Sequence, residues 1–394
     1  MAHPARWLLS LALIAPAAAQ KVEVEVREPD GPQRIGIHAR FQATEENKVL
    51  VNGQERGGFG GGAFGGRGGQ GSSGPQETVL EQDVEFVQGP ASDDYRDYVK
   101  LAAKETMPGR DGQPRETVVE GGLQGRKVWL GTDEAGGVVL REGRSRDSKP
   151  LEGGLARLVP PRVSLSGIAP KGEIAVGEEY DLSKSISGVL RCLAHPVVPA
   201  ANATPSGEAG DRASRSGEDP RQGQIARGAR GGAGFGGRGA FARRMGPGGA
   251  VLRLLGSGKL AAEAKGRVAK ISREQGADLA TIEFTARLRG KGDARELGLE
   301  DPAPTRPRRG DQGGTPFERS SRAEASLDLK GTATVDLTHR EVTRVSLEGE
   351  ISLDRESRTT MSRDGEDFTM ERTTRTKGRF GLEAKCEPVE EKAR

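Results

Sequence analysis

Apolar and polar residues alternate along the stretch from Ala323 to Leu353. Every second residue is apolar up to Leu337 apart from Gly331, and the alternation resumes at Val345 after the polar residues 338–341. A period of two places the apolar side chains on one face of a strand and the charged ones on the other. The pattern therefore predicts a long antiparallel hairpin with one buried face and one solvated face.

Further strands are expected wherever this alternation recurs. Two short strands begin the chain, at 22–26 and 35–41, on either side of the turn-like residues 29–32. The other expected strands are 79–87, 128–130, 138–140, 252–268, 280–288 and 368–386. Residues 95–103 fit a helix capped by Ser92 or a strand, and the pattern leaves both open. Strands of ten to fifteen residues are longer than usual, and sheets of such strands twist and curl.

Two short helices are expected near the middle of the chain. Leu151, Leu155 and Leu158 recur at helical spacing behind Ser148, a candidate N-cap. The second helix is expected near 181–194, with Asp181 as N-cap and Pro196 as stop. Its apolar residues fall on one helical face, which is typical of a helix that packs on a core. These are Leu182, Ile186, Val189, Leu190 and Leu193.

Three long inserts interrupt the periodic segments, at residues 53–75, 200–249 and 291–322. They are rich in Gly, Arg, Pro and mixed charge, and the whole chain has 59 Gly and 22 Pro with 34% hydrophobic residues. Such sequences bury too little apolar surface to offset the entropy of ordering the chain. We therefore expect the three inserts to be disordered.

The expected fold class is mainly β, a β-rich α+β protein. Long antiparallel hairpins form one or two curled sheets or half-barrels, with one or two short helices. One arrangement is a single curled sheet packed over the helix near 181–194. The other, which we favour, has an N-terminal β region at 20–160 and a C-terminal β region at 161–394.

Residues 1–19 have the pattern of a secretory signal peptide. Arg6 precedes an apolar run from Trp7 to Ala15, and alanines at 17–19 form a small-residue cleavage site. We expect cleavage near Gln20 and export to the periplasm or the extracellular space. No later apolar run approaches the ~20 residues that a transmembrane helix needs.

Two stretches resemble exported bacterial β-rich proteins of unknown function. In that loose family a proline precedes a Val-Gly stretch ahead of a helix, and a strand of the form Gly-x-Ala-x-Val-Asp leads into a hydrophilic hairpin. Lys171 to Tyr180 and Gly331 to Asp336 match this outline. The resemblance covers about half of the expected folded chain. It implies a β-rich exported protein and assigns no catalytic residue.

Cys192 and Cys386 are the two cysteines of the chain. Export favours oxidation of thiols. Cys386 occupies one of the alternating apolar positions of the last expected strand, and Cys192 lies beside the apolar face of the second expected helix. We expect a disulfide that joins helix to sheet, with two separate buried thiols as the alternative.

Basic residues could attract a polyanion at one of the inserts. The segment 227–249 is rich in glycine and has five arginines and no acidic residue: Arg227, Arg230, Arg238, Arg243 and Arg244. Such a segment can bind a surface polysaccharide or an anionic lipid, whereas an exported protein rarely meets nucleic acid. The whole chain is nearly balanced, with 60 basic and 57 acidic residues, so net charge favours no particular partner.

Glycines match the dinucleotide-binding fingerprint at 60, 62 and 65 and again at 232, 234 and 237. Neither match has the strand before it and the helix after it that place a pyrophosphate at a helix N-terminus. We therefore expect no cofactor.

Catalytic motifs are sparse. His38, His195 and His339 are widely spaced, and the sequence has no nucleophile-elbow serine, zinc-protease helix or phosphate loop. We therefore expect an exported non-enzymatic binding or scaffold protein. A hydrolase with carboxylates from distant strands stays an alternative, because such sites have no local signature.

A curled sheet offers a concave face as one binding surface for this protein. The inward residues Ala262, Ala264, Ala325 and Ala333 are small, and we expect them to leave room there. A lipid-like apolar ligand on this concave face is one version of the function, and polyanion binding by the Arg/Gly-rich insert is another.

Overall fold

The structure is a computed structural model that describes eleven stretches of the chain. They are residues 21–55, 75–109, 113–132, 138–145, 148–149, 151, 162–194, 247–274, 276–299, 317–363 and 366–389. The signal-peptide prediction for 1–19, the helix expected over 151–158 beyond Leu151, and most of each predicted insert lie outside these residues.

Strands make up most of the described chain, which confirms the mainly β fold class. The strands before residue 150 are β1 (Lys21–Glu23), β2 (Gln33–Val51), β3 (Gln54–Glu55), β4 (Gln76–Gln88), β5 (Tyr95–Pro108), β6 (Pro114–Glu120), β7 (Lys127–Thr132) and β8 (Val138–Arg141). The later strands are β9 (Glu173–Ala175), β10 (Glu179–Asp181), β11 (Ala261–Glu274), β12 (Ala277–Asp293), β13 (Phe317–Asp336), β14 (Glu341–Arg363) and β15 (Glu366–Pro388). The segment left open at 95–103 belongs to strand β5.

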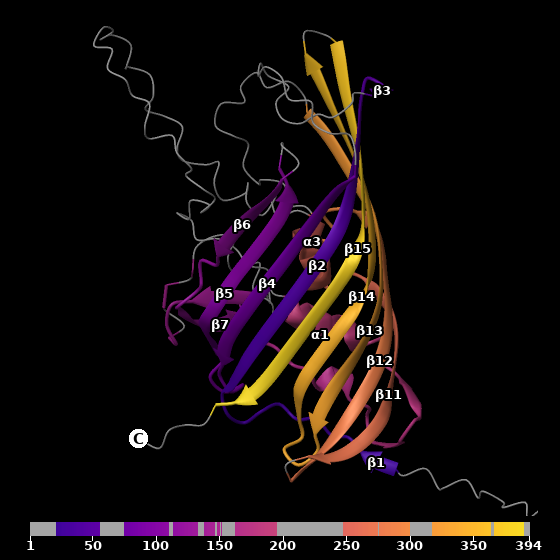
Figure 1. Cartoon of the computed structure of the whole chain (residues 1–394). Coiled ribbons are helices and arrows are strands. Elements are labelled where there is room, and N and C mark those ends of the chain that lie inside the picture. Colours follow the sequence, from indigo (N-terminus) through magenta and orange to yellow (C-terminus); the bar gives the residue numbers. More distant parts are fainter. Residues whose placement is uncertain are drawn as a thin grey trace, which may run out of the picture.

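Thirteen of these strands form one antiparallel sheet, and β1 and β9 form a separate pair. The long path of the sheet runs β10-β11-β12-β13-β14-β15-β2-β4-β5-β7-β8, with β3 and β6 attached at its sides. Figure 1 shows that the sheet curls, so that one of its faces is concave. The last strand, β15, pairs with β2 from Gln33↔Pro388 to Val51↔Met370. The strands of the two predicted regions are thus hydrogen-bonded into a single sheet.

The long hairpin at the centre of the sequence pattern is present as β13 and β14. The two strands pair from Asp336↔Glu341 outward, and residues 337–340 form the turn. Arg340 has a left-handed backbone conformation there, with φ of 59°. The inward residues of the hairpin, such as Leu327, Val345 and Leu353, are fully buried, as the alternation predicts.

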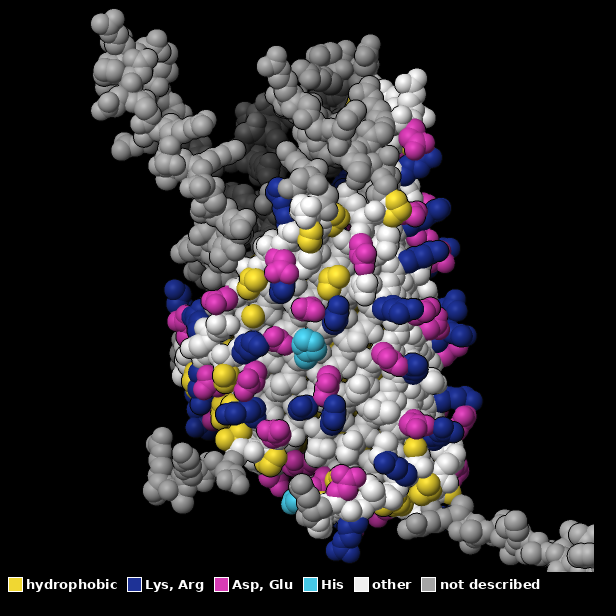
Figure 2. Space-filling view, in the orientation of Figure 1, with side chains coloured by type: hydrophobic (Ala, Val, Ile, Leu, Met, Phe, Trp, Pro, Cys, Tyr) yellow, Lys and Arg dark blue, Asp and Glu magenta, His cyan; other side chains and the backbone are white. Residues whose placement is uncertain are grey.

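The two faces of the sheet differ in chemistry. The outer face carries lysine, arginine, aspartate and glutamate side chains in alternation, and Figure 2 shows both signs interspersed over β4, β2 and β15. Many of these charges form cross-strand ion pairs, such as Arg34 with Glu85 and Arg344 with Glu383. The inner face is mainly apolar and belongs to one hydrophobic core, although a few polar side chains such as Gln82, Arg96 and Thr376 are also buried.

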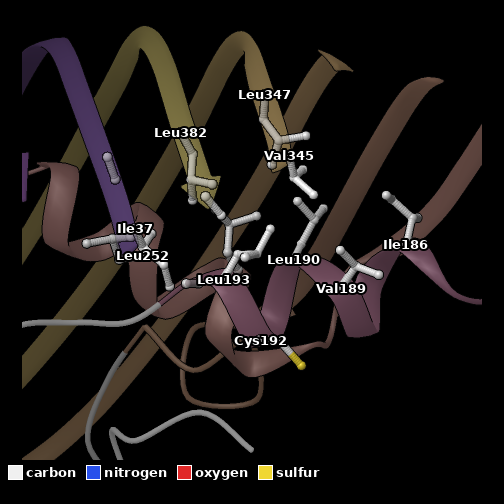
Figure 3. Packing of buried hydrophobic residues seen from close by; sticks show 14 of the residues in the cluster. Ile37, Ile186, Val189, Leu190, Cys192, Leu193, Leu252, Val345, Leu347 and Leu382 are labelled. Carbon is white, nitrogen blue, oxygen red and sulfur yellow. The ribbon is translucent and has the colours of Figure 1, made fainter. Parts of the chain in front are cut away.

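Two short helices, α1 (Ile186–Leu193) and α3 (Pro247–Ser257), pack on the concave inner face (Figure 1). Figure 3 shows Leu190 and Leu193 of α1 directed toward Leu382, Val345 and Leu347 of the sheet. A 3₁₀ turn, η2 (Ser166–Ile168), lies against α1. The core is therefore built between the sheet and its own helices.

Helix α1 is shorter than the sequence predicted. Asp181 belongs to strand β10 instead of capping the helix, and its Oδ1 accepts a hydrogen bond from the amide of Ser183, 2.9 Å away. This local bond stabilises a turn that places the first helical residue at Ile186. The expected stop at Pro196 lies outside the described residues.

Helix α3 corrects two predictions. Residues 252 and 254 were expected at the start of a strand, and 247–249 at the end of an insert, whereas all belong to this helix. Val251 and Leu255 are buried along with Leu252 and Leu254, which a helix on a core achieves and a strand with one wet face does not. The apolar residues at 252 and 254, taken alone, fit the period of a strand as well as that of a helix.

The edges of the predicted inserts also shift, because strands extend into them. Asn52 and Gly53 form a turn into β3, so the first insert begins later than residue 53. Strand β12 continues to Asp293, and β13 starts at Phe317. The interior parts of the inserts, 56–74, 200–246 and 300–316, lie outside the described residues.

Candidate functional site

The structure shows the two cysteines as separate buried free thiols, and the disulfide between them stays a prediction from the sequence. Cys192 Sγ donates a hydrogen bond to the carbonyl oxygen of Arg162 at 3.2 Å, and Figure 3 shows it directed away from the labelled strand residues. Burial raises the pKa of the Cys192 thiol, and it raises that of Cys386 to about 12. Both groups are therefore protonated near neutral pH.

The segment from Arg162 to Leu165 is fastened to the end of the sheet beside these thiols. The Gln88 side chain donates to the carbonyl oxygen of Val163 at 3.0 Å and accepts from the Val163 amide at 2.9 Å. Arg162 forms ion pairs with Glu28 at 3.0 Å and with Asp94 at 3.3 Å. Burial raises the pKa of Asp94 although Arg162 lies beside it. This polar cluster holds the segment in place and has a structural role.

The concave face does not have the room that the sequence suggested. Ala264, Ala325 and Ala333 are buried in the hydrophobic core, and Ala262 packs against it half-buried. Small residues instead allow close packing of the helices. At Gly248 of α3, for example, an added Cβ would lie 2.8 Å from the Leu80 side chain.

The five arginines predicted to contact a polyanion, Arg227, Arg230, Arg238, Arg243 and Arg244, lie outside the described residues, as does His195. His38 and His339 each contact one carboxylate on the surface, Asp83 at 2.7 Å and Asp336 at 2.8 Å. Within the described stretches, no group of three or more His, Cys, Asp or Glu side chains is arranged to hold a metal ion. None of the helices described here is long and apolar enough to cross a membrane.

A series of open hollows crosses the outer face, and we call it the outer trough. It follows one row of paired positions from β10 to β2, across seven neighbouring strands. That row is Asp181↔Lys265↔Thr285↔Lys330↔Glu348↔Gly381↔Arg40. The rows on either side supply further charged groups, Glu263, Arg287, Asp328, Glu350 and Arg379 on one side and Glu179, Arg267 and Glu283 on the other.

Three hollows make up the outer trough. Their volumes are about 640 Å³ near β10, 430 Å³ over β10 to β14, and 370 Å³ over β13 to β2. The first two share Glu179, Lys265 and Thr285, and the last two share Lys330 and Glu348, so they adjoin.

Ion pairs between neighbouring strands line the outer trough. Lys265 pairs with Glu179 at 2.9 Å, Arg287 with Asp328 at 2.8 Å, and Lys330 with Glu348 at 2.9 Å. The hydrogen bond from Lys265 lowers the pKa of Glu179, and the carboxylate partners raise the pKa of both lysines. A bound molecule therefore meets acidic and basic groups side by side.

No motif in the sequence marks these residues as a site. The alternation identified each of them as outward-facing, but it gives no register between strands. Which residues form one row follows only from the pairing of β10 with β11 and of β15 with β2, segments far apart in sequence. No family model matches the sequence, and no curated protein is significantly similar to it.

Proposed function

We propose that the mature chain is an exported binding or scaffold protein without enzymatic activity, and that it holds an extended polar partner in the outer trough. The observation that carries this proposal is the continuity of three hollows across seven strands of the outer face. The concave face supports an apolar ligand less well, because α1 and α3 already pack on it. Since the trough presents both signs of charge, it suits a polar chain better than a polyanion.

Blocking the outer trough tests this function. Thr285 faces outward and lines two of the hollows, so Thr285→Trp fills the trough with a large ring. Thr44 faces outward on the same face but lines none of these three hollows, so Thr44→Trp is the matched control. The probes are charged peptides, a neutral oligosaccharide and anionic phosphatidylglycerol vesicles, each at two salt concentrations.

We expect at least one probe that binds the full mature chain and the Thr44→Trp variant to lose most of its affinity for Thr285→Trp. Circular dichroism checks that both variants keep the fold. Equal binding by the two tryptophan variants for every probe that binds would mean that the outer trough is not the binding surface.

Export is the second part of the proposal. The n-region, apolar run and small-residue site within residues 1–19 support it, as does the family resemblance. The first strand begins at Lys21, so cleavage near Gln20 leaves β1 intact. We expect the N-terminus of the exported protein to be Gln20. If the protein stayed in the cytoplasm and kept residues 1–19, that result would contradict export.

A further inference from the structure

The charges that line the outer trough change from one end to the other. The hollow near β10 has four acidic and two basic residues: Glu179, Asp181, Glu263 and Asp328 against Lys265 and Arg287. The middle hollow has three of each sign. The hollow nearest β2 has three basic and two acidic residues: Arg40, Lys330 and Arg379 against Glu348 and Glu350. The trough is thus acidic at one end and basic at the other.

Some of the side chains that create this gradient are free of ion pairs, whereas Glu179, Asp328 and Lys330 are paired with neighbours in the trough. At the acidic end, Asp181 and Glu263 form no ion pair with any described residue. At the basic end, Arg379 likewise forms no ion pair within the described chain, and Arg40 lies 3.6 Å from Glu81. A ligand can therefore gain charge contacts with Asp181 and Glu263 at one end and Arg379 at the other without first breaking the short pairs Lys265–Glu179 and Arg287–Asp328.

The dimensions of the outer trough suit a short extended chain. Neighbouring strands lie about 4.8 Å apart, so six spacings between seven strands span roughly 29 Å. An extended peptide rises about 3.3 Å per residue, so about nine residues cover that length.

The lining favours a peptide over a sugar chain. The aromatic residues that border the trough, Tyr180, Phe284 and Phe380, belong to the inward-facing set, and the Tyr180 hydroxyl donates to the carbonyl oxygen of Ile168 at 2.7 Å. The rings of Phe284 and Phe380 are buried and Tyr180 is half-buried, so they offer little ring surface on which a sugar could stack. Charged groups of both signs and the hydroxyls of Thr285 and Thr332 instead match the side chains and amides of a peptide.

We infer that the outer trough binds an extended peptide of about nine residues, with its basic end over β10 and β11 and its acidic end over β15 and β2. This inference rests on the binding function proposed above and adds the class of partner and its orientation.

Two synthetic peptides test the inference on the full mature chain. Both contain three Lys, three Thr and three Glu with blocked termini, and in one the Lys come first and the Glu last, while in the other the charges alternate. Exposed ion pairs contribute about 0.2–1 kcal/mol each, so a few matched pairs predict roughly fivefold tighter binding of the segregated peptide. Fluorescence anisotropy measures the two affinities, and the difference should shrink at high salt because the charges are screened.

Charge reversals at the two ends locate the contacts. Glu263→Lys and Arg379→Glu should each weaken the segregated peptide by roughly threefold, whereas Arg375→Glu on the same strand β15 should not, because Arg375 faces outward away from the hollows. A benzophenone on the amino end of the peptide should crosslink to residues 179–183 or 263–267.

The outcomes separate the two proposals. If both peptides bind equally and Thr285→Trp still abolishes their binding, the binding function stands and the charge orientation is wrong. If a neutral six-unit oligosaccharide binds in the trough and the peptides do not, the binding function stands and the inferred peptide partner is wrong. If Thr285→Trp leaves binding unchanged, the trough function and the inference both fail.

Discussion

Gly331 lies beside the ring of Phe284 in the sheet, where its lack of a side chain is required. A Cβ added at Gly331 would lie 2.6 Å from Phe284 Cζ and 2.6 Å from the carbonyl oxygen of Ser346. Overpacking of this kind costs about 1–3 kcal/mol, so we expect Gly331→Ala to lower the free energy of unfolding by that amount. Gly36 is the control, because a Cβ added there meets no atom within 4 Å.

Urea denaturation measures both glycine variants. We expect Gly36→Ala to leave stability unchanged or raise it slightly, since alanine loses less backbone entropy on folding than glycine. Similar losses in Gly331→Ala and Gly36→Ala would show that strand glycines matter through the backbone alone, not through the ring of Phe284.

The two thiols provide a second prediction for single residues. Because Cys192 and Cys386 are buried and burial raises the pKa of each, neither is a ready nucleophile at pH 8. We expect a thiol reagent to find two thiols in the unfolded chain and to react slowly with the folded protein. Titration of the unfolded chain without reductant distinguishes two free thiols from a disulfide, because a disulfide would leave no thiol to react.

Single positions were the most predictable part of the sequence. The alternation correctly assigned Leu327, Val345 and Leu353 to the buried face, because the parity of a strand depends on its own residues alone. It gave no basis for the burial of Cys192 against Arg162, since that contact joins segments whose approach depends on the whole fold. The effect of a small residue such as Ala325 was also misjudged, because the position is packed inside the hydrophobic core.

At the scale of an element, the turn between β13 and β14 depends on Asp336. Its Oδ1 accepts hydrogen bonds from the amides of Thr338 and His339, and its Oδ2 lies 2.8 Å from His339 Nδ1. The hydrogen bond and charge of Asp336 raise the pKa of His339 above its ordinary 6.5. The protonated pair therefore stabilises the turn below about pH 6.5, and this contribution is lost as the pH rises through the raised pKa.

Titration of His339 by NMR tests this turn. We expect a midpoint above 6.5 in the wild-type protein and a lower one in Asp336→Asn, which keeps a side-chain oxygen for the two amides but loses the charge. Asp354→Asn removes an exposed carboxylate from the same hairpin and is the control. An unchanged midpoint in Asp336→Asn would show that the pair does not form in solution.

Elements differed in how well the sequence predicted them. The long strands β13 and β14 were identified correctly because a period of two persists over many residues. Part of helix α3 was assigned to a strand, because over so few residues the apolar positions 252 and 254 fit the strand period and the helix period equally well. Helix α1 was placed correctly but begun too early, since the Asp181 side chain serves equally as a helix cap or in the turn that it forms.

At the scale of the whole molecule, the outer trough shows the limit of prediction from sequence. Its charged residues were recognisable as solvated positions, and the mixed charge of that face was expected. Their arrangement in rows requires the order and register of seven strands, which come from both ends of the chain. The single sheet and the trough therefore share one cause, the pairing of β15 with β2.

This pairing predicts that the described sheet unfolds as one unit. Phe41 of β2 stacks on Phe380 of β15 with ring centroids 4.6 Å apart, and both rings are buried. Trp129 lies in β7, near the far end of the sheet, and is the one tryptophan beyond the predicted signal peptide. If the sheet is cooperative, Phe380→Ala, at a cost of about 3–5 kcal/mol, must destabilise the surroundings of Trp129 as much as the C-terminal strands.

Tryptophan fluorescence and far-ultraviolet circular dichroism follow the two parts during urea unfolding. We expect both midpoints to fall together in Phe380→Ala and to stay at the wild-type value in Phe368→Ala, whose ring is 37% exposed on the same strand. A fall in the dichroism midpoint with no change in fluorescence would instead indicate two independently stable regions. In that case the pairing of β15 with β2 joins two folding units. A ligand that binds the trough only when both strands are paired should then stabilise the two units together.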